Sequence, residues 1–369
     1  MRTDTPDPLG HEGRATSFIA SPDSKWIATA SEDETIVVWD AECGTIVQEW
    51  VAHQDHQVND LAFSPDSRHL VSAARGGWTT AGTLAVWDIS NGVHKAATLG
   101  GHTDVVTTCA WSPDGALIAS GSKDGTMRVW DAQTFQQRDP VFREDAEAVG
   151  EPPESLQFSP DTSYLAWRRN RPGRCSIWRP LAEEQLTLLL SNPSGRDVDV
   201  NALSFDPESR RIATAHGTDD TYEPQEECVV RIWDVATGAA LAVLAGHSAC
   251  VSDVSFAPDG RFLLSASVDR STKIWDADSW EETASLEEDS AVYKACFSPD
   301  GKYIATGSAN ATVRLWRTSD ASCAAVFTEH TYTWRFITHL AFSPDGQFLA
   351  SGDDDWIVHI RRLSDFIGH

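Results

Sequence analysis

The chain has 369 residues, of which 41% are hydrophobic and 23% are charged, the balance of a folded globular protein. Its 29 basic and 55 acidic residues leave a net charge of −26 at pH 7. This charge argues against nucleic-acid binding, because phosphate contacts need a basic surface. No apolar run reaches the roughly 20 residues that span a bilayer, and the first residues lack the apolar core of a secretory signal. We expect no nucleic-acid partner and no membrane partner.

The cysteines favour a reducing compartment. There are seven, an odd number, and no two have C-x-x-C spacing. Neither a disulfide framework nor a zinc ribbon is indicated. We therefore expect a cytoplasmic protein, with the nucleus as the alternative.

Two marks recur together along the chain. The first is a tetrapeptide built on Ser-Pro-Asp, whose prolines lie 41 to 51 residues apart; its copies are 20–23, 63–66, 111–114, 158–161, 205–208, 256–259, 297–300 and 342–345. The second is a tryptophan followed by Asp or Arg, at Trp39, Trp87, Trp130, Trp178, Trp233, Trp275 and Trp316. In the eighth unit, Arg361 stands at the place of this tryptophan.

The sequence between the marks predicts short strands. In the third unit, residues 118–122 read as a half-buried strand, 123–126 as a tight turn, and 127–130 alternate between apolar and polar. Ser-Pro-Asp before such a pair is typical of a hairpin turn. No convincing helical period extends over ten residues or more. Each unit is thus predicted to be an antiparallel sheet of about four strands, which must stack on its neighbours to bury both faces.

With its Gly-His pairs at Gly10-His11, Gly101-His102 and Gly246-His247, the chain resembles the WD-repeat (WD40-type) β-propeller family. The resemblance covers essentially the whole chain. It implies an all-β fold in one domain, 1–369, a closed propeller of eight four-stranded antiparallel blades, with the commoner seven as the alternative. The blade-like units are approximately 10–50, 51–100, 101–143, 144–191, 192–244, 245–286, 287–328 and 329–369, with residues 1–9 closing the last blade.

Several units contain His, Ser or Thr, Asp and Trp at one spacing, which could be mistaken for catalytic triads. Because the set repeats, the resemblance implies a buried structural hydrogen-bond network and no catalytic residues. The expected members are His11, Thr29, Asp33 and Trp39; His102, Ser120, Asp124 and Trp130; and His247, Ser265, Asp269 and Trp275. In unit 8, Arg361 is expected to pair with Asp355, and unit 7 has Asn310 in place of the turn aspartate.

No metal or cofactor site is predicted. His53 reads as the repeat histidine of unit 2, although His56 lies three residues away. The acidic runs 353–355 and 219–220 match no calcium loop and are expected to be solvated turns. No phosphate-binding or dinucleotide motif follows a predicted strand.

Three turns between the second and third strands are longer than the others. They are 75–82 in unit 2, the basic 168–174 in unit 4, and the acidic 217–228 in unit 5. In the family these turns lie on one face of the disc, which usually engages partners. The charged loops of units 4 and 5 either pair with each other or recognise a partner, and both hypotheses stay open.

A group of aromatic residues around unit 8 gives the sharpest functional signal. Clusters of Trp and Tyr with Arg mark binding surfaces. The alternative is that the longer loop of unit 8 folds over and fills the channel with its own aromatics. The partner-binding candidates are Trp334, Phe336, Trp356, Tyr293, Trp78, Arg14 and Asp354. By the register of the repeats, the rim of the channel also includes Thr16, Asn59, Thr107, Glu154, Asn201, Cys250, Ser252 and Thr338.

These patterns favour a non-catalytic scaffold that binds a peptide or protein segment on the loop face. The acidic surface favours a partner with a basic segment, since opposite potentials steer encounter. One alternative is a small-molecule binder or enzyme that uses the central channel. Another is a sensor module of a larger signalling receptor, although unit 1 begins so near Met1 that we expect no domain before it.

Overall fold

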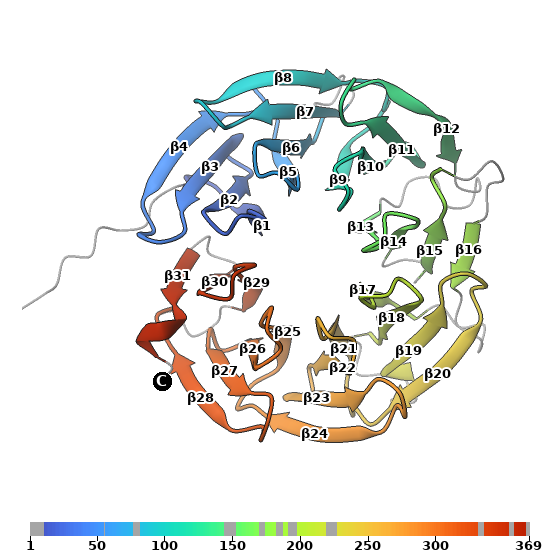
Figure 1. The fold of residues 1–369 in the computed structure, drawn as a ribbon, viewed down its shortest axis with the longest axis vertical. Coiled ribbons are helices and arrows are strands. Elements are labelled where there is room, and N and C mark those ends of the chain that lie inside the picture. The colour runs from blue at the N-terminus through green and yellow to red at the C-terminus, as the bar shows by residue number, and fades with distance from the viewer. Residues whose placement is uncertain are drawn as a thin grey trace, which may run out of the picture.

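The computed structural model describes residues 11–54, 56–76, 82–143, 153–169, 174–181, 187–190, 198–218, 227–330, 336–353 and 358–366. Figure 1 shows eight small sheets, called blades 1 to 8 in chain order, arranged in a ring around a central axis. In each blade the first strand is innermost, and successive strands lie farther out. The prediction of eight antiparallel blades is therefore confirmed, and the seven-blade alternative is set aside.

Every blade pairs its strands in chain order. Blades 1 and 2 contain β1 (Ala15–Ala20), β2 (Trp26–Ser31), β3 (Thr35–Asp40), β4 (Ile46–Val51), β5 (Val58–Phe63), β6 (His69–Ala74), β7 (Thr83–Asp88) and β8 (His94–Leu99). Blades 3 and 4 contain β9 (Val106–Trp111), β10 (Leu117–Ser122), β11 (Thr126–Asp131), β12 (Gln137–Arg143), β13 (Ser155–Phe158), β14 (Leu165–Arg169), β15 (Arg174–Trp178) and β16 (Thr187–Leu190). Blades 5 and 6 contain β17 (Val200–Phe205), β18 (Arg211–His216), β19 (Val229–Asp234), β20 (Ala240–Ala245), β21 (Val251–Phe256), β22 (Phe262–Ser267), β23 (Ser271–Asp276) and β24 (Glu282–Glu287). Blades 7 and 8 contain β25 (Val292–Phe297), β26 (Tyr303–Ser308), β27 (Val313–Arg317), β28 (Cys323–Phe327), β29 (Ile337–Phe342), β30 (Phe348–Asp353) and β31 (Val358–Arg362).

The core lies between the blades. All six residues of β10 are buried, because both faces of the sheet are covered by neighbouring blades. One apolar cluster joins Leu117 and Met127 of blade 3 to Leu156 and Trp167 of blade 4. Burial of each such large side chain stabilises the fold by about 1.5–3 kcal/mol. The outer strands have one side in water, and Val51 of β4 is 58% exposed.

The Ser-Pro-Asp turns lie on the face of the ring where each first strand ends. In blade 3, the Ser112 hydroxyl donates to Asp114 at 2.6 Å and accepts from the Leu117 amide at 2.9 Å. These bonds close the hairpin between the first and second strands, as predicted. The opposite face carries the turns between the second and third strands, and we call it the loop face.

A series of short hydrogen bonds connects neighbouring blades near the loop face. At each junction from blade 1 to blade 7, a side chain of one blade donates to a backbone carbonyl at the start of the next blade. The donor and acceptor pairs are Thr16 and Val58, Asn59 and Val106, Thr107 and Pro153, Arg168 and Val200, Asn201 and Val251, and Ser252 and Val292. We call this set the inner-rim bonds. Most of the donors are rim positions that the repeat register had identified.

Asp60 adds a deeper connection between three blades. Its carboxylate accepts from Ser17 of blade 1 at 3.0 Å, from Thr108 of blade 3 at 2.9 Å, and from the Leu61 and Cys109 amides at 2.9 and 3.0 Å. Burial raises the pKa of Asp60, and these donors oppose that rise. One carboxylate therefore fixes how blades 1, 2 and 3 sit on each other.

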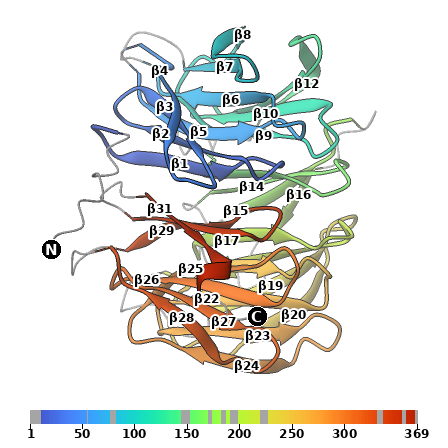
Figure 2. The ribbon, with the colours of Figure 1, turned by 60° about the vertical axis from the view of Figure 1, so that its left-hand side comes forward.

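Blade 8 closes the ring against blade 1, as Figures 1 and 2 both show. Phe348 of blade 8 shares an apolar cluster with Trp39 of blade 1, and Arg362 pairs with Glu42 at 2.7 Å. In the described part of the chain this blade has three strands, followed by a 3-10 turn at Leu363–Asp365. The predicted closing segment, residues 1–9, lies outside the described residues. The described residues form no helix long and apolar enough to cross a membrane.

The contacts of Asp60 predict a large effect of removing its carboxylate. Asp60→Ala leaves the hydroxyls and amides of three blades without their acceptor, so we expect a loss of about 2–4 kcal/mol in the free energy of unfolding. Urea unfolding measures this loss. Asp278→Ala, at an exposed turn aspartate, is the control and should change stability by less than about 0.5 kcal/mol. Equal stability of the two variants would contradict a locking role for Asp60.

Candidate interaction face

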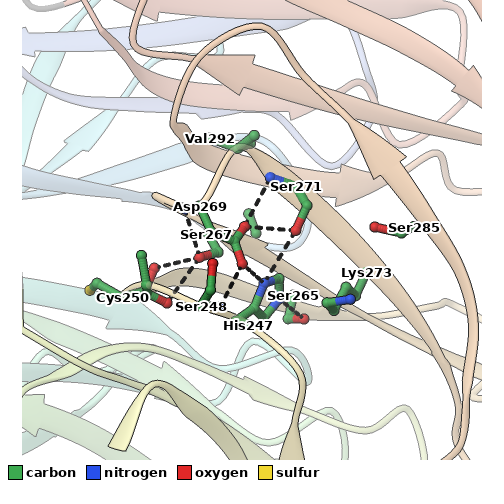
Figure 3. A network of polar contacts seen from close by, with 12 residues as sticks. His247, Ser248, Cys250, Ser265, Ser267, Asp269, Ser271, Lys273, Ser285 and Val292 are labelled. Atoms are coloured by element: carbon green, nitrogen blue, oxygen red, sulfur yellow. Dashed lines mark hydrogen bonds and ion pairs between the residues drawn. The ribbon is translucent and has the colours of Figure 1, made fainter. Parts of the chain in front are cut away.

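The predicted His–Ser–Asp network of blade 6 is present (Figure 3). His247 bonds through Nδ1 to Asp269 at 2.8 Å and through Nε2 to the Ser265 hydroxyl at 2.7 Å. The Trp275 indole donates to the same hydroxyl at 2.8 Å. These four residues come from the loop before β21 and from β22, β23 and the turn between them, so the network ties the blade together internally.

The distances among His247, Ser265 and Asp269 resemble those of a catalytic triad, but Ser265 is too deeply buried to act as a nucleophile. The Ser265 side chain is fully buried, at 0% exposure, and its oxygen is already bonded to both His247 and Trp275. A nucleophile must reach a substrate carbonyl beside an oxyanion hole. Ser265 cannot do so, and the set is structural.

Blades 1 and 3 repeat this arrangement, as expected. His102 bonds to Asp124 at 3.0 Å and to Ser120 at 2.7 Å, and its ring packs on Trp130 with 5.9 Å between ring centres. In blade 1, His11 bonds to Asp33 and Thr29, and Trp39 donates to Thr29 at 3.0 Å. His53 of blade 2 is the repeat histidine, bonded to Ser72 at 2.7 Å.

Blade 8 holds a complete network that sequence reasoning missed. His330 bonds to Asp353 at 2.8 Å and to Ser351 at 2.9 Å, and Arg361 donates to Ser351 at 2.8 Å in place of the tryptophan. Arg361 also pairs with Glu329 at 2.5 Å. The expected partner Asp355 lies outside the described residues. The expectation that 353–355 is a solvated turn is wrong for Asp353, because its bond to His330 draws it into the blade, where it is 4% exposed.

Blades 5 and 7 replace network members with other residue types. In blade 7, the buried Glu288 takes the place of the histidine and accepts from Thr306, Ser308 and Arg314. In blade 5, His216 comes from the end of β18 and bonds to Thr214 at 2.7 Å, while Trp233 donates to the same hydroxyl. The sequence signal for these sets is a Thr at the position that Ser265 holds in blade 6, namely Thr306 and Thr214.

Burial and hydrogen bonding shift the pKa values in opposite directions. Burial, with the nearby Arg231, lowers the pKa of His216 to about 3. Burial alone would raise the pKa of Asp269, but hydrogen bonds from His247, Ser271 and Ser248 hold it below its ordinary value. The Asp269 carboxylate is thus a charged acceptor, which suits a role in holding N–H and O–H groups in place.

Possible metal ligands and free thiols occur in the described part of the chain. No group of three or more His, Cys, Asp or Glu side chains there is placed to hold a metal ion. His53 and His56 form no such group, since His53 is committed to Ser72. Burial raises the pKa of Cys175 and of Cys296 to about 12, so neither thiol is a ready nucleophile.

The aromatic candidates that the structure describes lie together on the loop face. Phe336 precedes β29 and is 42% exposed, and its ring packs on Tyr293 of β25 with 5.3 Å between ring centres. Both rings border a cavity of about 280 Å³ at the inner rim. Arg14, which is exposed, lies just before β1 on the neighbouring blade 1. Trp334, Trp356, Trp78 and Asp354 lie outside the described residues.

The two charged loops show pairing within their own blades at their bases. Arg168 pairs with Glu154 at 3.0 Å in blade 4, and Arg231 pairs with Glu227 at 3.1 Å in blade 5. The tips, 170–173 and 219–226, lie outside the described residues. Both earlier hypotheses for these loops stay predictions.

The histidine pair of blade 8 predicts a pH effect. The His359 ring packs edge-on against His330, 4.5 Å between centres, and burial, with His330 and Arg361 nearby, lowers its pKa from 6.5 to about 4. Between pH 6.5 and pH 4 the unfolded chain binds a proton at His359 that the folded chain does not, so the free energy of unfolding falls as pH falls.

His359→Phe keeps a ring at this position but removes the group that binds the proton. Urea unfolding at pH 7 and pH 5 should show a smaller loss for the variant, by up to about 1.4 kcal/mol per pH unit. Parallel losses in both proteins would contradict this assignment.

Comparison with known proteins adds relatives and a solved structure. The chain is 27% identical over 270 residues to nuclear distribution protein PAC1 of Gibberella zeae, which covers 68% of this chain and 56% of that one. It is 26% identical to target of rapamycin complex subunit LST8 of Bos taurus, covering 68% and 72%, and 27% identical to a guanine nucleotide-binding protein subunit beta of Zea mays, covering 56% and 54%. The chain thus spans little more than half the length of some relatives. The crystal structure of the computationally designed Ika8 protein matches with a TM-score of 0.74 and 23% identity, over 96% of this chain and 98% of that one.

The WD40 family model, described as WD domain, G-beta repeat, matches residues 6–40, 44–88, 94–131, 238–276, 280–317 and 321–361. These segments cover blades 1 to 3 and 6 to 8, while the degenerate blades 4 and 5 are known from the structure. With more than half of its residues matched and every blade in register, the chain belongs to the WD-repeat β-propeller family.

Proposed function

We propose that this protein is a non-catalytic interaction scaffold that binds a peptide or protein segment on its loop face. The observation that carries the proposal is the exposed Phe336 ring, packed on Tyr293 beside a cavity at the inner rim. Exposed aromatic clusters on a rigid frame concentrate binding energy. The frame here is rigid because each blade is packed on both faces.

The family supports the coarser part of this proposal. WD-repeat relatives include proteins named as a subunit of the target of rapamycin complex and a subunit of a guanine nucleotide-binding protein. Those names describe members of protein assemblies. A scaffold role for this chain, which shares their repeat, follows naturally.

Catalysis is not part of the proposal. The repeated His–Ser–Asp sets are buried and committed to the fold, as Ser265 shows. A small-molecule binder or enzyme using the channel, and a sensor module of a larger signalling receptor, are the alternatives. The cavity at the inner rim is the observation that favours a small-molecule site.

The charge of the whole chain bears on how a partner arrives. A net charge of −26 attracts basic segments over distances longer than a contact. We propose that the partner carries such a segment and that the encounter takes place in the cytoplasm. The rate of association should then fall as salt is added, because ions screen this attraction.

The proposal predicts that the two rings are needed for binding. Tyr293→Ala with Phe336→Ala should remove specific partners from an affinity capture with native lysate, and the capture is run below the melting temperature measured for each variant. Phe366→Ala is the matched control, because Phe366 is similarly exposed, at 45%, but follows β31 on the opposite face. Partners retained by the double variant, or lost equally from the control, would rule out the loop face as the binding site.

A further inference from the structure

The inner-rim cavity is built from the first strands of several blades. Its volume of about 280 Å³ lies just below the roughly 300–1,000 Å³ of small-molecule sites. It therefore suits one large side chain better than a cofactor. Its lining includes Asn201, Ser252, Val268, Tyr293, Lys294 and Phe336.

The cavity lies where the inner-rim bonds stop. Ser252 of blade 6 still donates to the Val292 carbonyl of blade 7 at 2.6 Å. Blade 7 has Tyr293 at the place of the next donor, and its ring packs on Phe336. Thr338, the matching residue of blade 8, bonds within its own blade, to His339 Nδ1 at 2.9 Å. An aromatic contact thus replaces the short polar contact at the seam between blades 7 and 8.

The cavity carries a cationic group, Lys294, although the chain as a whole is acidic. Lys294 lines the cavity, with 38% of its side chain exposed, and its ammonium group is 3.7 Å from Asp253. Arg14 of blade 1 lies beyond blade 8 from Lys294, is exposed, and forms no ion pair with a described carboxylate. Burial, with Lys294 and Arg14 as the nearby charges, lowers the pKa of His339 between them to about 4. No described Asp or Glu lines the cavity itself.

Resting on the proposed function, we infer that the cavity takes an apolar side chain of the partner segment, and that a carboxylate next to that side chain contacts Lys294 and Arg14. The Tyr293 and Phe336 rings and Val268 supply the apolar wall. A basic side chain at this point would meet Lys294 in a site partly shielded from water, where repulsion between like charges is costly. The basic segment that the net charge attracts would lie elsewhere on the partner.

A library of random twelve-residue peptides displayed on phage tests this inference directly. Selection on the intact protein should enrich peptides with an aromatic or large aliphatic residue and an Asp or Glu within three positions of it. The enriched peptide is then synthesised, and its dissociation constant is measured by titration against variants.

Two matched variants separate a cavity contact from a general loop-face contact. Val268→Trp fills the cavity and should raise the dissociation constant of the peptide at least tenfold. Lys123→Trp in blade 3 is the control and should change the dissociation constant less than twofold. The two residues hold the same turn position, because the Val268 amide donates to the Cys250 carbonyl and the Lys123 amide donates to the Val105 carbonyl.

A charge reversal keeps the test decisive should Val268→Trp fail to fold. Arg14→Glu should weaken the acidic peptide at least fivefold and strengthen a version in which Lys replaces its Asp or Glu. The selection could instead enrich apolar peptides that carry Arg or Lys and that the Tyr293→Ala, Phe336→Ala double variant no longer binds. That result would overturn the inference and leave the proposed function standing. No enrichment, or enrichment insensitive to that double variant, would overturn both. Acidic peptides that bind Val268→Trp and Arg14→Glu unchanged would overturn the inference.

Discussion

The structure depends on one constraint: each blade is a small sheet with two apolar faces, and it cannot bury both by itself. Leu117 and Met127 of blade 3 find cover only on blade 4, and Phe348 of blade 8 only on blade 1. A row of such sheets has two exposed ends, and these ends disappear only when the row closes into a ring. Closure therefore adds a full sheet-to-sheet contact, so the whole chain, rather than any single blade, is the unit of stability.

Polar contacts then decide how the blades are positioned. The buried networks hold each blade together internally, whereas the inner-rim bonds and Asp60 connect one blade to the next. The donors of the inner-rim bonds, from Thr16 to Ser252, are therefore already bonded to backbone carbonyls of the next blade. Blade 8 differs, because Tyr293 and Phe336 meet at one of its sides and His339 faces Phe18 at the other, with 6.5 Å between ring centres. Gly307 of β26 lets this blade approach closely, since a Cβ there would lie 2.5 Å from Ile337.

The blade count and the networks of blades 1, 3 and 6 could be predicted from sequence because their residues recur at one spacing, each within a single repeat. Glu288 and the His330–Asp353 pair could not, because there the network is rebuilt from residues at shifted positions or of another type. The same geometry can be met by Glu288 in place of His, and by Arg361 in place of Trp, provided that an N–H group donates to the buried hydroxyl. Substitutions of this kind depend on three-dimensional proximity, which spacing does not encode. The contact between the aromatic candidates could not be predicted from spacing for the same reason. Tyr293 and Phe336 are 43 residues apart in the sequence and meet because their blades are neighbours.

The break in the inner-rim bonds explains why recognition should concentrate at blade 8. A rim whose hydroxyls and amides already bond to backbone carbonyls presents few free polar groups to a ligand, because giving up an internal bond offsets the bond gained. At the seam between blades 7 and 8 the Tyr293 and Phe336 rings pack on each other, and a third apolar group can pack against them. Lys294 then supplies a cationic group at the cavity in a chain that is acidic as a whole. Long-range attraction and short-range fit are thus set by different residues, so a partner can be steered by one part of its sequence and selected by another.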